Sequence, residues 1–401
     1  MIFPSFVGEL IKKIEDNGFE AFLVGGSVRD FLLGKDPSDF DIATSANPDD
    51  IIRIFEGYHI VPTGIKHGTV TVFANETPVE ITTYRKDGKY KDFRHPESIT
   101  FSADIKDDLS RRDFTVNAMA YNQRLGLLDL FSGRTDLSAR IIRCVGDPYI
   151  RFREDALRIM RAMRFSAALG FRIEKETKDA IFSLKGLLKN ISRERILDEF
   201  KKTLLADSVE NVLSEYFYIF EEILGVDIKS NLLKWKENAK TVSSAKKDFC
   251  IRTSLLLDGL IDFKMQKEVL TSLRFDKKTI GTILILSEYL NKKLPLSIPS
   301  IKSVLSKTGV SDFELILDAK EAKKDMPRQN LLTARIILDT IIKENGCFSL
   351  RQLKINGADL KTALGISGKA VGDILNSLLD AVIYEKCENE KRVLLEYAKK
   401  L

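Results

Sequence analysis

The segment LVGGSVRDFLLG (residues 23–34), followed closely by DFDI (residues 39–42), decides the fold of the first part of the chain. Its pattern predicts a buried strand, a glycine turn and the start of a helix. A short strand then follows, and alternation along it points Asp39 and Asp41 to the same side. Backbone N–H groups at the turn suit an anion, and paired carboxylates suit a divalent metal. The stretch therefore predicts a phosphate-and-metal site.

The composition is that of a soluble globular protein. The chain has 401 residues, of which 44% are hydrophobic and 30% charged, so we expect two or more domains and no disordered chain. No uncharged apolar run reaches membrane-spanning length, and residues 1–18 lack the order of a signal peptide. The net charge of +5 only weakly favours a polyanionic partner. We expect a cytoplasmic enzyme.

Metal-binding patterns built on cysteine or histidine are missing from the sequence. The four cysteines stand singly at 144, 250, 347 and 387, and the three histidines lie at 59, 67 and 95. This spacing predicts neither a zinc site nor a redox dithiol. Any metal would therefore be held by carboxylates.

Helices and strands alternate over the first 140 residues. The pattern predicts helices over 5–17 and 48–55, strands over 19–24, 58–73 and 79–85, and a polar loop over 85–98. That loop is rich in lysine, arginine and aromatic residues, so it suits either a nucleotide contact or an exposed hairpin.

Two later segments combine charge with helical periodicity. In DDLSRRDFTVNAMA (107–120), charge gives way to a small apolar helix, on which Arg112, Asp113 and Asn117 share a surface only if the first turn is irregular. In RFREDALRIMRAMRF (151–165), Asp155, Arg158 and Arg161 recur at threes on one side of a helix. The second pattern indicates either a surface ion pair or a rigid surface that reads base edges.

Beyond residue 166 the pattern is almost entirely helical. Amphipathic periods recur in segments such as 192–206, 211–224, 277–293 and 334–346. Near the end, glycines at 357 and 368 open helices whose N–H groups could hold RNA phosphates, although helix–helix turns are the commoner meaning.

Taken together, these segments resemble the class II tRNA nucleotidyltransferase and bacterial poly(A) polymerase family of the DNA polymerase β superfamily. The resemblance rests on six pieces in the family's order and spacing. They are LVGGSVRDFLLG, DFDIATSA (39–46), TGIKHGTVTV (63–72), VEITTYR (79–85), DDLSRRDFTVNAMAY (107–121) and REDALRIMRAMRFSAALGF (153–171).

The resemblance implies an α+β protein. A small mixed α/β nucleotidyltransferase head with a polymerase β-like sheet would span residues 1–138. An all-helical neck with the nucleotide-template helix (139–206), a helical body (207–298) and a helical tRNA-binding tail (299–401) would follow. The implied partners are nucleoside triphosphates and tRNA, contacted at its acceptor arm and T-loop mostly through phosphates.

The resemblance also implies a role for each site residue. Asp39 and Asp41 would bind two Mg²⁺ ions for in-line transfer. Glu80 would be a third carboxylate, or else a structural acid facing Arg85 or Lys66. The other implied site residues would bind the nucleotide. Gly25, Gly26 and Arg29 would contact the triphosphate, and Arg112, Asp113 and Asn117 would sense the ribose. Asp155 and Arg158 would select the base, with support from Arg161.

Four activities remain open within the family: CCA addition, CC addition, A addition and poly(A) synthesis. The polymerases usually carry a basic Gly-Arg/Lys-Arg/Lys-Phe stretch where this chain has PTGIKHGT (62–69), and CC-adding enzymes typically lack a loop like that of 85–98. We therefore favour addition of CCA from CTP and ATP with release of pyrophosphate, with A-only addition as the alternative. Residues 166–401 contain no histidine, so no appended phosphohydrolase domain is expected.

Two classes outside the family are disfavoured. A non-catalytic RNA-binding protein on this fold would be expected to lose one acid of the pair, yet both Asp39 and Asp41 are present. A nucleotidyltransferase acting on antibiotics or proteins would have no use for Asp155 and Arg158 or for a long helical region.

Overall fold

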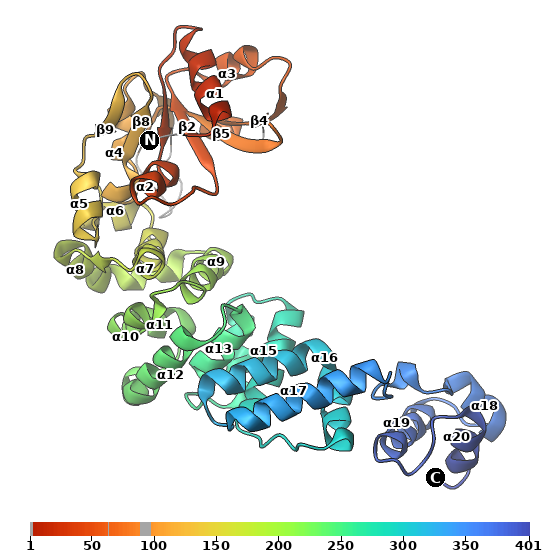
Figure 1. Ribbon diagram of the computed structural model, residues 1–401. Coiled ribbons are helices and arrows are strands. Elements are labelled where there is room, and N and C mark those ends of the chain that lie inside the picture. Colours follow the sequence, from red (N-terminus) through yellow and green to blue (C-terminus); the bar gives the residue numbers. More distant parts are fainter. Residues whose placement is uncertain (1–2, 63, 89–97) are drawn as a thin grey trace. The chain divides into compact units, whose positions relative to one another are not determined.

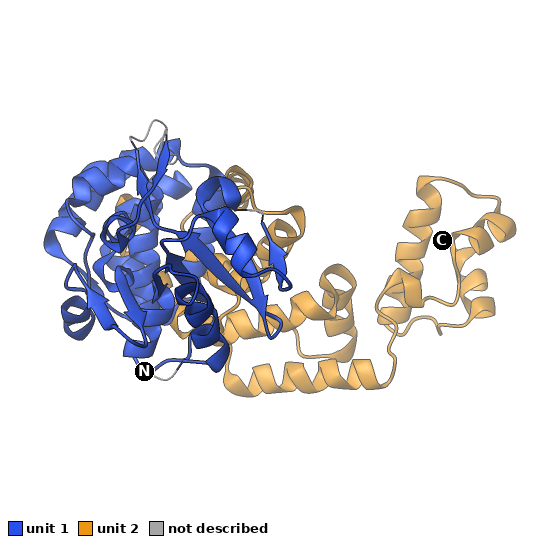
Figure 2. Ribbon diagram, turned by 90° about the horizontal axis from the view of Figure 1, so that it is seen from above, with its two compact units in different colours: residues 1–226 blue, residues 227–401 orange. Residues whose placement is uncertain are grey.

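A computed structural model describes residues 3–62, 64–88 and 98–401, which form two compact units. The first unit ends at Val226 and the second begins at Asp227 (Figure 2). This boundary falls inside the predicted body, and the division into four modules stays a prediction. Among the described residues, no helix is long and apolar enough to cross a membrane.

A seven-stranded mixed sheet forms the centre of the first unit, in the order β3-β4-β5-β2-β1-β8-β9 (Figure 1). Only β2 and β5 run parallel, and the other neighbours are antiparallel. The strands are β1 (Ala21–Val24), β2 (Phe40–Thr44), β3 (His59–Val61), β4 (Thr69–Ala74), β5 (Thr77–Thr83), β8 (Met119–Asn122) and β9 (Gly126–Asp129). The predicted α+β fold class is confirmed.

The register of the central strands places the acidic residues. Every residue of β1 is buried, as the apolar run predicts, and Val24 pairs with Asp41 of β2. On the other side, Asp41 is directly opposite Glu80 of β5. Opposite residues of paired strands point to the same face, so Asp41 and Glu80 are neighbours.

Helices cover the sheet where the sequence predicts them. Helix α1 spans Ser5–Glu15, α2 Gly26–Leu32 and α3 Pro48–Ile54. In α3, the Asn47 side chain accepts a hydrogen bond from Asp50 N (3.0 Å), and Pro48 occupies the first turn. A capping side chain and an N-terminal proline are typical of a helix start, and they fix the beginning of the helix predicted over 48–55.

The apolar helix predicted around residues 114–120 is wrong. After α4 (Ile105–Ser110), residues Thr115–Asn117 form a short 3₁₀ turn (η2) and Met119 begins β8. The backbone of β8 bonds β1 on one side and β9 on the other, so pairing in the sheet outweighs the local preference for a helix.

The single helix predicted over 151–165 is also wrong, because the chain breaks at Asp155. Helix α6 spans Pro148–Glu154 and α7 spans Leu157–Leu169. Asp155 is extended (φ −138°, ψ 102°), and its Oδ1 accepts a hydrogen bond from Leu157 N at 3.0 Å. A short acidic side chain that bonds nearby backbone competes in this way with a continuous helix.

The predicted helical remainder is confirmed. The described helices are α8 (Lys175–Leu184), α9 (Arg193–Leu204), α10 (Val209–Glu215) and α11 (Phe217–Leu224) in the first unit, and α12 (Leu232–Ser244), α13 (Phe249–Leu257), α14 (Phe263–Ser272), α15 (Lys277–Leu290), α16 (Ile298–Lys323), α17 (Arg328–Lys343), α18 (Gly357–Leu364), α19 (Lys369–Ile383) and α20 (Lys391–Ala398) in the second.

Two further sequence hypotheses concern the helix opened by Gly357 and the loop over 85–98. The side chains of Asn356 and Asp359 form a capping box, so amides at the start of α18 already have partners within the protein. In the predicted loop 85–98, β6 (Arg85–Asp87) pairs with β7 (Ile99–Phe101), and residues 89–97 lie outside the described part of the chain.

Candidate active site

A polar cleft of about 670 Å³ in the first unit gathers nearly all the predicted site residues. Its lining carries seven arginines and five aspartates. The lining residues are Gly25, Gly26, Arg29, Asp30, Ser38, Asp39, Asp41, Arg111, Arg112, Asp113, Asn117, Asp155, Leu157, Arg158, Arg161, Arg164, Phe165 and Arg195. Of the predicted residues, only Glu80 is not in this lining.

The glycine turn leaves room for an arginine. Gly25 has a φ of +75°, and a Cβ atom there would lie 2.8 Å from Nη1 of Arg112 and 3.9 Å from Oδ2 of Asp41. The backbone conformation therefore requires glycine, and any larger residue would displace the Arg112 guanidinium. The backbone of the turn, Arg112 and Asp41 consequently meet at one point of the cleft.

The acidic residues belong to two adjacent strands, with Asp39 and Asp41 at β2 and Glu80 on β5. Asp39 is exposed just before β2, and Asp41 is partly buried within it. Burial raises the pKa of Asp41 to about 6; Arg112 opposes this rise, while repulsion from Glu80 and Asp39 adds to it. Within the described residues, no group of three or more His, Cys, Asp or Glu side chains is arranged to hold a metal ion.

A hydrogen-bonded chain joins the triphosphate and ribose candidates. Arg29 donates from Nη1 to Asn117 Oδ1 at 2.6 Å, and Asn117 Nδ2 donates to Asp113 Oδ1 at 3.1 Å. Asp113 Oδ2 accepts from Arg161 Nε at 2.7 Å. Burial alone would raise the pKa of Asp113, but Arg161 and Asn117 lower it to about 2. Asp113 is therefore a buried anion that fixes two neighbours.

Asp155 and Arg158 line the same cleft without pairing with each other. Asp155 Oδ2 accepts a hydrogen bond from Arg195 Nη2 at 3.1 Å. Arg158 is buried, and its Nη1 contacts Glu154 Oε2 at 2.8 Å while its Nη2 donates to the Arg111 carbonyl at 2.9 Å. The simple Asp155–Arg158 surface ion pair is thus excluded, and each side chain is held by other partners.

Sequence reasoning predicted Arg112 but missed several residues in or beneath the cleft. Arg111 and Arg112 both pair with Asp108, which is completely buried beneath them. Phe165 is packed by the guanidinium groups of Arg29, Arg161 and Arg164, at 5.3, 5.3 and 4.1 Å from its ring centre. The spacing could have indicated Asp108, because it precedes Arg111 by three positions and Arg112 by four. Arg195 lay in a segment interpreted only as a helix.

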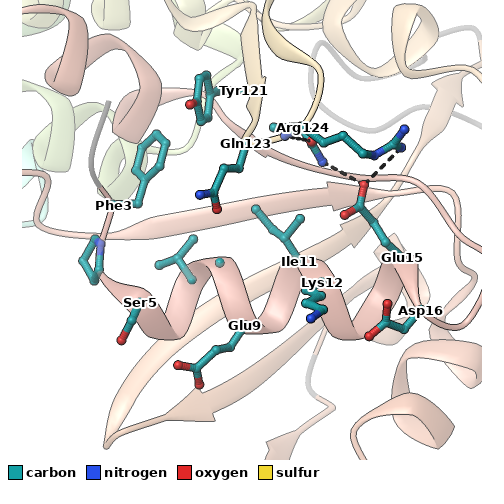
Figure 3. A pocket seen from close by; sticks show the side chains of 14 residues that line it. Phe3, Ser5, Glu9, Ile11, Lys12, Glu15, Asp16, Tyr121, Gln123 and Arg124 are labelled. Atoms are coloured by element: carbon teal, nitrogen blue, oxygen red, sulfur yellow. Dashed lines mark hydrogen bonds and ion pairs between the residues drawn. The ribbon is translucent and has the colours of Figure 1, made fainter.

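A second, larger hollow of about 890 Å³ lies between α1 and the β8–β9 turn (Figure 3). Its floor is largely apolar, with Phe3 and Tyr121 at one end. At the other end, Glu15 Oε1 accepts from Asn122 Nδ2 at 3.0 Å and lies 3.4 Å from Arg124 Nη2. It contains none of the predicted site residues, so we assign the chemistry to the polar cleft.

Family models match the chain in three successive segments. “Poly A polymerase head domain” matches residues 21–143, “Probable RNA and SrmB- binding site of polymerase A” residues 170–216, and “tRNA nucleotidyltransferase domain 2” residues 253–398. Together with the sheet and its polar cleft, these matches define a nucleotidyltransferase.

Similar proteins narrow the class. The chain is 35% identical to a CCA-adding enzyme of Ligilactobacillus salivarius, covering 98% of this chain and 95% of the relative. It is 38% identical to a CCA-adding enzyme of Leuconostoc citreum over the same shares. A crystal structure of the Bacillus stearothermophilus CCA-adding enzyme in complex with CTP matches with a TM-score of 0.84 and 28% identity, covering 100% of this chain and 98% of that one. The chain belongs to the CCA-adding enzyme family.

Proposed function

We propose that this chain adds CCA to the 3′ end of tRNA, taking cytidylate from CTP and adenylate from ATP and releasing pyrophosphate. The observation that carries the proposal is the convergence of Asp39, Asp41 and the arginines with Asp155 and Arg158 in one cleft. Full-length similarity to CCA-adding enzymes supports the same assignment over A-only addition, CC-only addition and poly(A) synthesis.

Magnesium is the metal that the acids fit. Asp39, Asp41 and Glu80 offer only oxygen donors, and the strand register brings the carboxylates of Asp41 and Glu80 together. Mg²⁺ prefers oxygen ligands and is commonly held by one or two carboxylates together with water and substrate phosphates. When bound, two Mg²⁺ ions would activate the terminal tRNA hydroxyl and neutralise charge on the triphosphate.

The glycine turn and its arginines suit the triphosphate. Gly25 and Gly26 allow backbone to approach the phosphates, and Arg29 and Arg112 carry the positive charge that a transferring phosphoryl group requires. Little covalent chemistry is required of the protein in such a transfer, so positioning and charge account for most of its work.

The Asn117–Asp113–Arg161 chain suits the ribose end of the nucleotide. Both carboxylate oxygens of Asp113 are already used by Asn117 and Arg161. We therefore assign Asp113 a positioning role, in which it orients Asn117 towards Arg29 and holds Arg161 in the cleft. Ribonucleotides would be preferred because this fixed polar surface can bond a ribose hydroxyl.

Asp155 and Arg158, which we name the template pair, suit cytosine and adenine. Both bases carry an exocyclic amino group that a carboxylate can accept from, and a ring acceptor that a guanidinium can donate to. Uracil and guanine present a carbonyl oxygen where the amino group would be, so the carboxylate would repel them. Restraint of the pair by Arg195 and Glu154 favours a fixed reading geometry.

Nucleotide incorporation on three tRNA transcripts tests the proposal. Transcripts ending at the discriminator base, at C and at CC are incubated separately with each of the four nucleotides. We expect CTP to be added to the first two, ATP to the third, and neither UTP nor GTP to any. Failure to use CTP, with ATP added to the CC-ended transcript, would replace the proposal with A-only addition.

A further inference from the structure

We propose that α8 and the turn after it carry a separate RNA contact, in which the Phe182 ring stacks on an unpaired base between phosphates held by lysines. The inference rests on the proposed function, because it names a further contact for the same RNA substrate. Its residues repeat at intervals of three and four. They are Lys175, Lys178, Phe182, Lys185 and Lys189, which we call the lysine stripe.

One face of the Phe182 ring is covered by a tyrosine, and the rest of the ring is largely exposed beside Lys178. Its ring stacks on Tyr218 of α11, with centroids 3.8 Å apart and planes inclined by 22°. The Phe182 residue is nevertheless 41% exposed, whereas Tyr218 is buried. Because Tyr218 covers one face, the exposed area must belong to the opposite face and the edge. A ring supported from behind and open in front is a platform for a base.

Ammonium groups flank the platform. Lys178 Nζ lies 5.9 Å from the centre of the Phe182 ring, and Lys185 Nζ lies 5.4 Å from that of Tyr218. Lys178 is one helical turn before Phe182, and Lys185 follows at the start of the next short turn. The two charges therefore lie next to the stacked rings, where phosphates adjoining a stacked base would be found.

Acidic neighbours leave this charge available. Lys178 pairs with Glu215, and Lys189 pairs with Glu222 at 3.2 Å. Each pair has one well-exposed member, Glu215 in the first and Lys189 in the second, so solvent screening weakens the pairs and an RNA phosphate can compete for the lysines. The stripe also lies within the segment 170–216, matched by a family model for RNA binding, which favours RNA over an acidic protein.

A tryptophan at position 182 provides a direct probe. The chain has one native tryptophan, Trp235, which is completely buried in the second unit. The emission of Phe182→Trp minus that of the wild type therefore reports the platform. We expect quenching when tRNA lacking CCA is added, and weaker quenching at higher salt. Equal quenching by heparin, a polyanion without bases, or no quenching by RNA would overturn the inference.

Two shorter RNAs identify the source of the base. One is an unpaired oligonucleotide ending in CC, and the other is a hairpin of the acceptor stem closed by the T-loop. Quenching by the oligonucleotide assigns the platform to the 3′ end, and quenching by the hairpin alone assigns it to a loop base. An acidic peptide that quenches while neither RNA does would replace RNA with a protein partner.

Kinetics then separates this inference from the proposed function. Phe182→Ala should raise the KM for tRNA about fivefold or more while leaving kcat and the KM for CTP unchanged. Phe182→Trp should behave as the wild type, as should Leu125→Ala, which removes another exposed apolar side chain elsewhere in the unit. Normal transfer with an unchanged KM for tRNA in Phe182→Ala overturns only the platform. Absence of transfer in the wild type overturns the proposed function, and RNA quenching would still support the platform.

Discussion

Asp155 is oriented by Arg195, which lies forty residues further along the chain: Arg195 Nη2 donates to Asp155 Oδ2 at 3.1 Å. Arg158, the other member of the template pair, is held instead by Glu154 and by two backbone carbonyls. The template pair is thus assembled from α7, the break before it and α9. Its geometry depends on contacts that no single helix could provide.

Arg195→Ala should reduce nucleotide selectivity without preventing transfer. A hydrogen bond between charged groups is worth about 1.5–3 kcal/mol, so a loosened Asp155 should lower kcat/KM for CTP and ATP roughly tenfold or more relative to UTP. Single-turnover assays with each nucleotide on the three transcripts measure this ratio. Arg53→Ala is the control, because it removes one partner of an exposed Arg–Asp pair outside the cleft. If both variants leave the ratio unchanged, Arg195 does not position Asp155.

The sequence predicted the sheet region well because its signals are local. The apolar run of β1, the glycine turn and the acids of β2 each follow from neighbouring residues, and α3 from its Asn47 cap and Pro48. The two wrong helices have different causes. Met119 is drawn into a strand by the distant strands β1 and β9. Asp155 breaks a helix through a local bond to Leu157 N, which the helical spacing of the charged residues does not reveal.

The composition of the cleft was predictable only where it followed motifs. Gly25, Asp41 and Arg158 belong to segments with recognisable patterns. Arg195, by contrast, lies outside the quoted motifs and contributes by pairing with Asp155. Arg164 lies in the same motif as Arg158, but its contribution comes from packing on Phe165. Such partners depend on how distant segments meet, and a helical period in α9 gives no indication of which face meets the cleft.

Asp41→Ala should abolish transfer while leaving tRNA binding largely intact. Asp41 is assigned to the metal site beside the glycine turn, and tRNA would be bound mostly elsewhere through phosphates. Rates of CTP incorporation and a filter-binding assay with labelled tRNA measure the two properties separately. Chelation of Mg²⁺ in the wild type should reproduce the loss, and added Mg²⁺ should reverse it. Retained transfer by the variant would exclude Asp41 as a metal ligand.

Glu80→Gln distinguishes a third carboxylate from a structural acid. Glu80 is exposed and paired in register with Asp41, so its amide should weaken metal binding without disturbing the strand. We expect kcat to fall at least tenfold, with partial recovery at higher Mg²⁺ concentration. Glu76→Gln, an exposed acid at the neighbouring β4–β5 turn, is the matched control. A rate equal to the wild type at every Mg²⁺ concentration would make Glu80 structural.

Asp113 should make stability depend on pH in the acid range. Its pKa is lowered from 3.8 to about 2, so the ionised form stabilises the native state above pH 4 by about 2 kcal/mol. That contribution is lost as the pH falls from about 4 towards 2. Asp113→Asn should therefore be less stable at pH 7, and its free energy of unfolding should fall less between pH 4 and pH 2 than that of the wild type. Urea unfolding followed by circular dichroism at several pH values measures both effects. Equal falls in the two proteins would contradict the prediction.

Gly25→Ala should impair nucleotide binding more than its effect on the backbone alone would predict. Alanine at the Gly25 conformation (φ +75°, ψ −132°) costs roughly 1–3 kcal/mol, and its Cβ would also displace Arg112, whose Nη1 is only 2.8 Å away. Gly18→Ala is the control, since Gly18 also has a positive φ (+86°) but no atom within 4 Å of the added Cβ. Both variants should lose thermal stability, whereas only Gly25→Ala should raise the KM for CTP and ATP, by about tenfold for one lost charged contact. An equal KM in the two variants would mean that Arg112 does not contact the nucleotide, and would leave Arg29 as the arginine assigned to the triphosphate.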